Sequence, residues 1–212
     1  MSRDMLIRND IRFVGVARSL SDAEWPLPSL CTEWSNHEVL AHLVVGYRAS
    51  LRELAVGMAS QRGSFDSANA ALAAGVAQRR SPAELIDEYL ALIHQPRGIG
   101  RVFPRRLLLG DHVIHELDIV LALGRQPGIP LPTLVAVLDT QVRVPNPFVP
   151  AAARARGLTL RAADADWTHG EGGRTVSGTA AHLASALAGR PWALDRLSGD
   201  GVDALSERVS AG

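Results

Sequence analysis

The stretch that decides the fold runs from Arg106 to Leu123 and reads RLLLGDHVIHELDIVLAL. At 100° per residue, nearly every face of a helix with this sequence carries Leu, Ile or Val. The exception is a narrow stripe of Asp111, His115 and Asp118, which stand at i, i+4 and i+7. A helix that is apolar all round is normally buried, and buried carboxylates and imidazoles are costly unless they are paired or bind a metal. The stripe is therefore a candidate functional site.

A histidine elsewhere in the chain offers a partner for this stripe. His42 lies on the flank of another predicted amphipathic helix, beside the small residues Gly46 and Ala49. A histidine on one long helix that faces an Asp/His pair on another is a familiar way to build a metal site inside a bundle. Two imidazoles and one carboxylate supply three ligands and leave one position open, which is the catalytic arrangement for zinc and also suits Fe(II) or Ni(II).

A structural explanation stays open for the same residues. An aspartate and a histidine at i, i+4 can bond to each other and satisfy themselves in the core. His42 taken alone is an ordinary half-buried histidine. If it lies too far from Asp111 and His115 to share an ion, the three form only a polar cluster. Within the stripe, Asp118 is the better candidate for a carboxylate that orients an imidazole than for a ligand.

Composition excludes several classes of function. The chain has 212 residues, 47% of them hydrophobic, and its 22 basic residues balance 22 acidic ones. This balance argues against general binding to nucleic acids or to anionic membranes, since both depend on excess positive charge. Every basic residue is arginine, so no lysine can form a Schiff base or serve a P-loop. The single cysteine, Cys31, excludes an intrachain disulfide and a zinc cluster of cysteines.

The N-terminal segment and the lengths of the apolar runs indicate the cellular compartment of the protein. The N-terminus runs into an amphipathic segment without the long apolar core of a signal peptide. No apolar run approaches the roughly 20 residues that a membrane span needs. We therefore expect a soluble, cytoplasmic protein.

Periodicity predicts a helical N-terminal part and a mixed C-terminal part. A capping box of Ser35 and Glu38 begins one long helix, and Ser81-Pro82-Ala83-Glu84 begins another. Gly124 is a plausible C-cap of the helix that carries the stripe. The expected elements are helices at 4–20, 35–58, 68–79, 82–94, 104–123, 132–143 and 179–188, and strands at 158–162 and 174–177. We predict a helical bundle at 1–143, a proline-rich linker at 144–156 and a small α/β domain at 157–212.

Two signatures and the tail of the chain carry a family resemblance. Trp25, Pro28-Ser29, Cys31 and Trp34, followed by Glu38-Val39-Leu40-Ala41-His42-Leu43, form the first signature; Asp111, His115 and Asp118, followed by Ala122-Leu123-Gly124-Arg125, form the second. The tail adds Val176-Ser177-Gly178, Ala186-Leu187-Ala188-Gly189-Arg190 and Gly199-Asp200-Gly201. With these motifs in order, the chain resembles the mycothiol-dependent maleylpyruvate isomerase family of the DinB/YfiT-like superfamily.

The resemblance implies a fold and a set of site residues. The fold is mainly α, with a DinB-like four-helix bundle followed by a small C-terminal α/β domain. The implied cofactor is a divalent metal, zinc first and nickel or iron as alternatives, held by His42, Asp111 and His115. The family often has glutamate where this chain has Asp111. Arg190 matches a frequent family arginine, to which the resemblance gives a catalytic role in holding an anionic group of substrate or thiol; a surface arginine after a helix is the structural alternative.

The implied function is that of a thiol-dependent enzyme. A metal-activated thiolate of mycothiol, or of a related low-molecular-weight thiol, attacks a small electrophilic substrate. The result is an S-conjugate or an isomerisation by addition and elimination, so the protein is expected to be a transferase or an isomerase. The alternative is a non-catalytic metal- or small-molecule-binding module on the same fold. The expected partners are the substrate and the thiol, with no nucleic acid and no membrane, and the expected state is a monomer or a homodimer.

Overall fold

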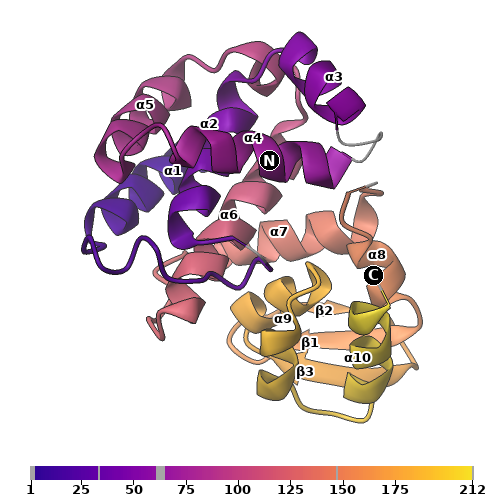
Figure 1. Cartoon of the computed structure of the whole chain (residues 1–212). Helices are drawn as coiled ribbons and strands as arrows, with labels where there is room; N and C mark the ends of the chain where they lie inside the picture. The colour runs from indigo at the N-terminus through magenta and orange to yellow at the C-terminus, as the bar shows by residue number, and fades with distance from the viewer. Residues whose placement is uncertain (1–2, 33, 61–64, 147, 212) are drawn as a thin grey trace. The chain divides into compact units, whose positions relative to one another are not determined.

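Two compact units make up the chain in this computed structural model, which describes residues 3–32, 34–60, 65–146 and 148–211 (Figure 1). One unit covers residues 2–108 and the other 109–212, so the division falls inside α6 (Arg105–Ala122). Most of the described residues are helical, and a small three-stranded sheet lies in the C-terminal part. The predicted fold class, mainly α with a small C-terminal α/β part, is confirmed.

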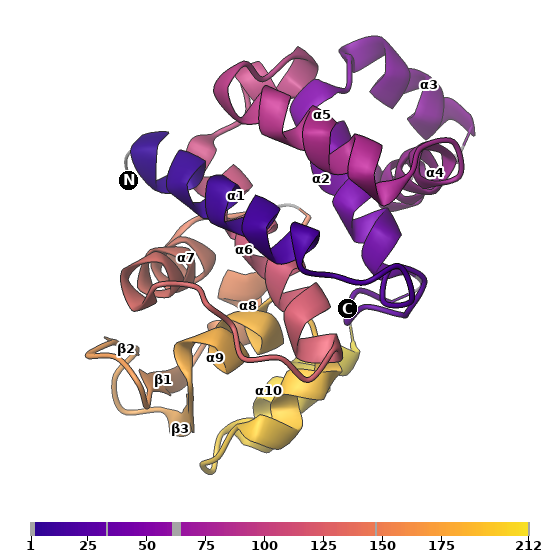
Figure 2. The ribbon, with the colours of Figure 1, turned by 90° about the vertical axis from the view of Figure 1, so that its left-hand side faces the viewer.

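The unit 2–108 is built from helices around α2. Its elements are α1 (Arg3–Arg18), α2 (Asn36–Arg48), α3 (Leu51–Ser60), α4 (Phe65–Ala77), α5 (Pro82–His94) and the short 3-10 helix η1 (Gly98–Arg101). The α2 helix packs against α4 and α5, and α1 packs against α5 (Figure 2). Phe13, Tyr47 and Tyr89 are almost completely buried where these helices meet, and the Tyr47 hydroxyl donates a hydrogen bond to the buried Asp10 carboxylate. An aromatic core thus encloses one satisfied polar pair.

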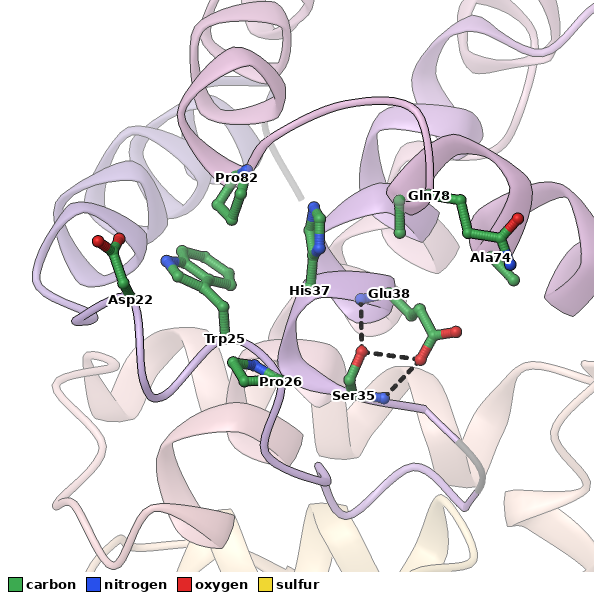
Figure 3. A pocket seen from close by; sticks show the side chains of 10 residues that line it. Asp22, Trp25, Pro26, Ser35, His37, Glu38, Ala74, Gln78 and Pro82 are labelled. Atoms are coloured by element: carbon green, nitrogen blue, oxygen red, sulfur yellow. Dashed lines mark hydrogen bonds between the residues drawn. The ribbon is translucent and has the colours of Figure 1, made fainter.

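The start of α2 is fixed by the predicted capping box. The Ser35 hydroxyl oxygen accepts from the Glu38 backbone N–H, and the Glu38 carboxylate accepts from the Ser35 backbone N–H (Figure 3). This reciprocal pair satisfies donors that a helix start otherwise leaves open. Ser81 and Glu84 do the same at the start of α5. Both helix starts were predictable because the motif is local in sequence.

The single helix predicted at 35–58 is wrong, because the structure has two helices there. Ala49 has extended backbone angles, and Ser50 and Glu53 form another reciprocal cap at the start of α3. The carbonyl oxygens of Tyr47 and Ala49 accept from the backbone N–H groups of Arg97 and Ile99. These carbonyls therefore bond to a segment about fifty residues later instead of continuing the helix.

The unit 109–212 combines the rest of α6 with a small sheet and its helices. Its further elements are α7 (Leu131–Arg143), α8 (Ala151–Ala155), β1 (Leu158–Ala162), β2 (Thr168–His169), β3 (Arg174–Gly178), α9 (Ala180–Leu187), the 3-10 helix η2 (Pro191–Arg196) and α10 (Val202–Ser210). The strand order is β2-β1-β3, with β1 antiparallel to β2 and parallel to β3. The α9 helix packs on β1, β3 and α7 (Figure 1). Leu160, Val176 and Leu183 form the buried centre of this layer.

The elements expected in this part of the chain are present, and some others were not predicted. Gly124 ends α6 with a φ of 66°, as its predicted role as a C-cap requires. The elements not predicted are α8, which lies inside the predicted linker, the short strand β2, the 3-10 helix η2, and α10. The boundaries of the predicted domains stay a prediction, and residue 147 of the linker lies outside the described residues. Among the helices described, none is long and apolar enough to cross a membrane.

Gly98 is a position where only glycine fits. Its φ is 49°, and a Cβ built there would lie 2.0 Å from the Ala49 carbonyl oxygen. We expect Gly98→Ala to lower the free energy of unfolding by more than about 2 kcal/mol, since it adds a clash with backbone to the usual left-handed strain of about 1–2 kcal/mol. Gly124→Ala is the matched control, because Gly124 also has positive φ but no atom within 4 Å of the added Cβ. Urea unfolding followed by circular dichroism measures both, and equal losses would contradict the clash.

Candidate metal centre

A fully buried carboxylate anchors the polar stripe of α6. Asp118 has no exposed surface. The Arg190 side chain donates two parallel hydrogen bonds to it, from Nε to Oδ1 at 2.8 Å and from Nη2 to Oδ2 at 2.7 Å. Arg190 follows α9 in the chain, so the pair ties α6 to a segment 72 residues later. This bidentate geometry is among the strongest that a carboxylate can have in a protein.

The surroundings of Asp118 keep it ionised. Burial on its own raises the pKa of this carboxyl, because it disfavours the charged form. The charge and hydrogen bonds of Arg190, with a smaller contribution from His115, outweigh burial and hold the pKa below its ordinary value. Asp118 is therefore a hydrogen-bond acceptor only.

The ionised Asp118 sets the tautomer of His115. The His115 Nδ1 atom lies 3.0 Å from Asp118 Oδ2, so Nδ1 carries the proton and donates it in this bond. When the imidazole is neutral, its lone pair is then on Nε2, and the Asp111 Oδ1 atom lies 3.6 Å from that nitrogen. The His115 side chain is 9% exposed, whereas the Asp111 side chain is 39% exposed. The stripe thus presents a basic nitrogen and a carboxylate oxygen side by side, which is a donor set that suits a divalent metal.

His42 has the same kind of support in the other unit. It lies on α2 and is buried, with the centroid of its ring 4.9 Å from that of Trp34. Its Nδ1 atom lies 3.2 Å from the Oδ1 atom of Asn69, which is on α4. An amide oxygen can only accept, so Nδ1 donates here too, and in the neutral form of the ring the lone pair is on Nε2. A hydrogen bond that fixes the second ring nitrogen is the usual support for a metal-binding histidine.

The structure groups most of the predicted site residues. Within the unit 109–212, His115 and Arg190 contact Asp118, and Asp111 lies beside the other ring nitrogen of His115. His42 belongs to the unit 2–108. The joint coordination of an ion by His42, Asp111 and His115 stays a prediction.

Arg190 has protein partners that the sequence did not reveal. Besides its two bonds to Asp118, its Nη1 atom donates to the Ala188 carbonyl oxygen at 3.2 Å, and its side chain is 17% exposed. This geometry makes Arg190 a positioning residue, which acts on His115 through Asp118. The predicted contact between Arg190 and an anionic group of substrate or thiol stays a prediction.

A separate shallow pocket lies beside the start of α2. Its volume is about 510 Å³, and Trp25, Pro26, His37 and Pro82 contribute to its wall (Figure 3). Burial lowers the pKa of His37. The lining includes none of the predicted site residues described above, so this pocket is distinct from the candidate metal centre.

Comparison with known proteins agrees with the resemblance. Residues 9–95 match the model of the mycothiol maleylpyruvate isomerase N-terminal domain family. Two solved structures are similar to the chain, one of the mycothiol-dependent maleylpyruvate isomerase and one of a variant with a histidine replaced by alanine. Each has 16% sequence identity and a TM-score of 0.60, and the match covers 93% of this chain and 91% of that one. No curated protein sequence matches the chain.

These comparisons confirm the resemblance to this family. The family match covers the part of the chain that contains the His42 signature. The structural match extends over the C-terminal part as well and shows a shared fold.

We predict that Asp118 and Arg190 are strongly coupled. Replacing Arg190 alone, as Arg190→Gln, leaves a buried charge without its partner, and breaking such a pair costs about 3–5 kcal/mol of stability. Replacing both residues, as Asp118→Asn with Arg190→Gln, is expected to cost less than the two single losses added together, since neither change then leaves a charge unpaired. Urea unfolding of the two single variants and of the double variant measures the coupling. Additive losses would show that the pair contributes nothing as a unit.

Proposed function

We propose that this protein is an enzyme that joins a low-molecular-weight thiol of the mycothiol type to a small electrophilic substrate with the help of a divalent metal. The product is either the S-conjugate or an isomer of the substrate. Two observations support the proposal: the family match names mycothiol, and the solved structures with this fold are those of a mycothiol-dependent isomerase. The side chains of the candidate metal centre provide the third support.

The metal part of the proposal rests on the hydrogen bonds of His42 and His115, which involve the same ring nitrogen in both residues. The Nδ1 atoms of His42 and His115 both face an oxygen, of Asn69 and Asp118 respectively. Both imidazoles therefore have their basic lone pair on Nε2, the atom with which they would bind an ion.

His42, Asp111 and His115 would hold the ion, with zinc as the proposed metal and nickel or iron as alternatives. Such an ion lowers the pKa of a thiol, so that it supplies a thiolate at neutral pH. Asp118 holds the proton of His115 at Nδ1, and Arg190 holds Asp118 in place. The thiolate sulfur would form a bond to the electrophilic carbon while the π bond of an unsaturated keto acid, or a C–O bond of an epoxide, breaks; the displaced electron pair goes to oxygen, and the product takes up the proton that the thiol lost. In an isomerisation, rotation about the new single bond is followed by cleavage of the C–S bond, which re-forms the double bond and releases the thiol unchanged.

The proposal also includes the partners, the cellular location and the oligomeric state of the protein. The partners are the thiol and the small electrophile, with no role for nucleic acid or membrane. We propose the cytoplasm as the location and a monomer or homodimer as the working state.

The test is a thiol-dependent turnover assay. Zinc-loaded protein is incubated with mycothiol and a panel of electrophiles that includes maleylpyruvate, other unsaturated keto acids and epoxides. We expect mycothiol to accelerate the conversion of at least one of them, a strong chelator to abolish the acceleration, and added zinc to restore it. His115→Ala is expected to lower kcat/KM at least about 100-fold, since it removes a proposed ligand.

His94→Ala is the control for that variant, because His94 is an exposed histidine on α5. It should retain the activity of the wild type. If mycothiol accelerates no electrophile in the panel, or if the chelator leaves the rate unchanged, the proposed function is wrong.

A further inference from the structure

The unit 109–212 contains a cavity away from the metal centre. Its volume is about 480 Å³, and it lies between the end of α6, the loop that follows it, and the starts of α7, α9 and η2. This volume is in the range of small-molecule sites in proteins. Leu121, the α6 residue that lines it, comes six positions after His115. At a rise of 1.5 Å per residue, it lies about 9 Å further along the helix axis.

The wall of this cavity combines apolar and polar side chains. The large aliphatic side chains are those of Leu121, Ile129, Leu131 and Leu134. The side chains with polar groups are those of Arg125, Gln126, Asp164, Thr179, His182, Trp192 and Arg196. A ligand that fills the cavity would therefore have an apolar body and a polar end.

Two contacts with Trp192 orient the exposed Arg196 side chain at this cavity. Its Cζ atom lies 3.3 Å from the centroid of the Trp192 ring, and its Nη1 atom donates to the Trp192 carbonyl oxygen at 2.7 Å. These two contacts lay the guanidinium on the indole. Because the group is planar and has five N–H donors, its other edge can still bind a carboxylate in a bidentate manner. A donor that is already ordered loses little entropy on binding.

The charges around the cavity favour an anion. The lining contains two arginines, Arg125 and Arg196, and one aspartate, Asp164. The Oδ1 atom of Asp164 accepts from the Ala180 backbone N–H at 2.8 Å, so its charge faces the start of α9. Burial lowers the pKa of His182, and Arg196 lowers it further against a smaller opposing effect of Asp164, which leaves the imidazole neutral at pH 7.

We propose that this cavity is a binding site for a small organic carboxylate with an apolar body, separate from the metal centre. The carboxylate is held by Arg196, and the apolar body packs against Leu121 and Leu134. The site needs no metal and takes no part in the proposed reaction, so it goes beyond the proposed function.

The test compares 4-phenylbutyrate with its neutral amide, using isothermal titration calorimetry on the full chain. We expect the carboxylate to bind at millimolar or lower concentration and the amide to bind at least tenfold more weakly. Arg196→Gln should weaken binding of the carboxylate at least tenfold. Arg174→Gln, which removes an exposed arginine on β3 outside the cavity, should leave it unchanged. The carboxylate should also change the fluorescence of Trp192, and this change should be lost in Trp192→Phe.

A carboxylate could also bind to a metal, and the His115→Ala variant distinguishes this outcome. Binding that survives His115→Ala and is weakened by Arg196→Gln supports the proposed site. Binding that is lost in His115→Ala but kept in Arg196→Gln places the carboxylate at the metal centre and overturns the proposal. No binding of the carboxylate at millimolar concentration, or equal binding of the amide, overturns it as well. None of these outcomes depends on thiol turnover, so the proposed function is tested separately.

Discussion

The charge of Asp118, which has no exposed surface, is the constraint on which the candidate site depends. Removal of a carboxylate from water costs several kcal/mol even after the protein relaxes, so Asp118 can be buried only if it is paired with a cation. The Arg190 guanidinium is that cation, and it donates two hydrogen bonds to the Asp118 carboxylate. The Nδ1–H group of His115 donates a further hydrogen bond to the same carboxylate. The hydrogen bonds that stabilise the buried Asp118 therefore also determine which nitrogen of His115 carries the proton and which one could bind a metal.

The backbone after α9 delivers Arg190 to this position. Gly189 has a φ of 91°, and a Cβ there would lie 2.9 Å from the Arg154 side chain, so the turn requires glycine. The next residue, Arg190, donates its backbone N–H to the Ser185 carbonyl oxygen at 3.0 Å. The short sequence that ends α9 thereby fixes both the direction of the chain and the place of the guanidinium. The orientation of His115 thus depends on a residue of the C-terminal part that is far from it in sequence.

Local signals made much of the fold predictable from the sequence, and contacts over long distances in the chain account for what was missed. Capping boxes at Ser35 and Ser81 and the glycine after α6 mark helix ends within a few residues, so those ends were predicted. The stripe on α6 was also visible, because its residues share one helix face. The break between α2 and α3 depends on backbone bonds to Arg97 and Ile99, and the partner of Asp118 is 72 residues away, so no local pattern showed either. The support of His42 by Asn69 was missed for the same reason.

Metal analysis of the purified protein is the decisive measurement for the metal centre. We expect about one divalent ion per chain in the wild type after loading with zinc, and its loss in His42→Ala and in His115→Ala while both variants stay folded. The exposed His94→Ala variant should keep the ion. A wild type that binds no ion, or variants of His42 and His115 that both retain it, would contradict a metal centre built on these two histidines.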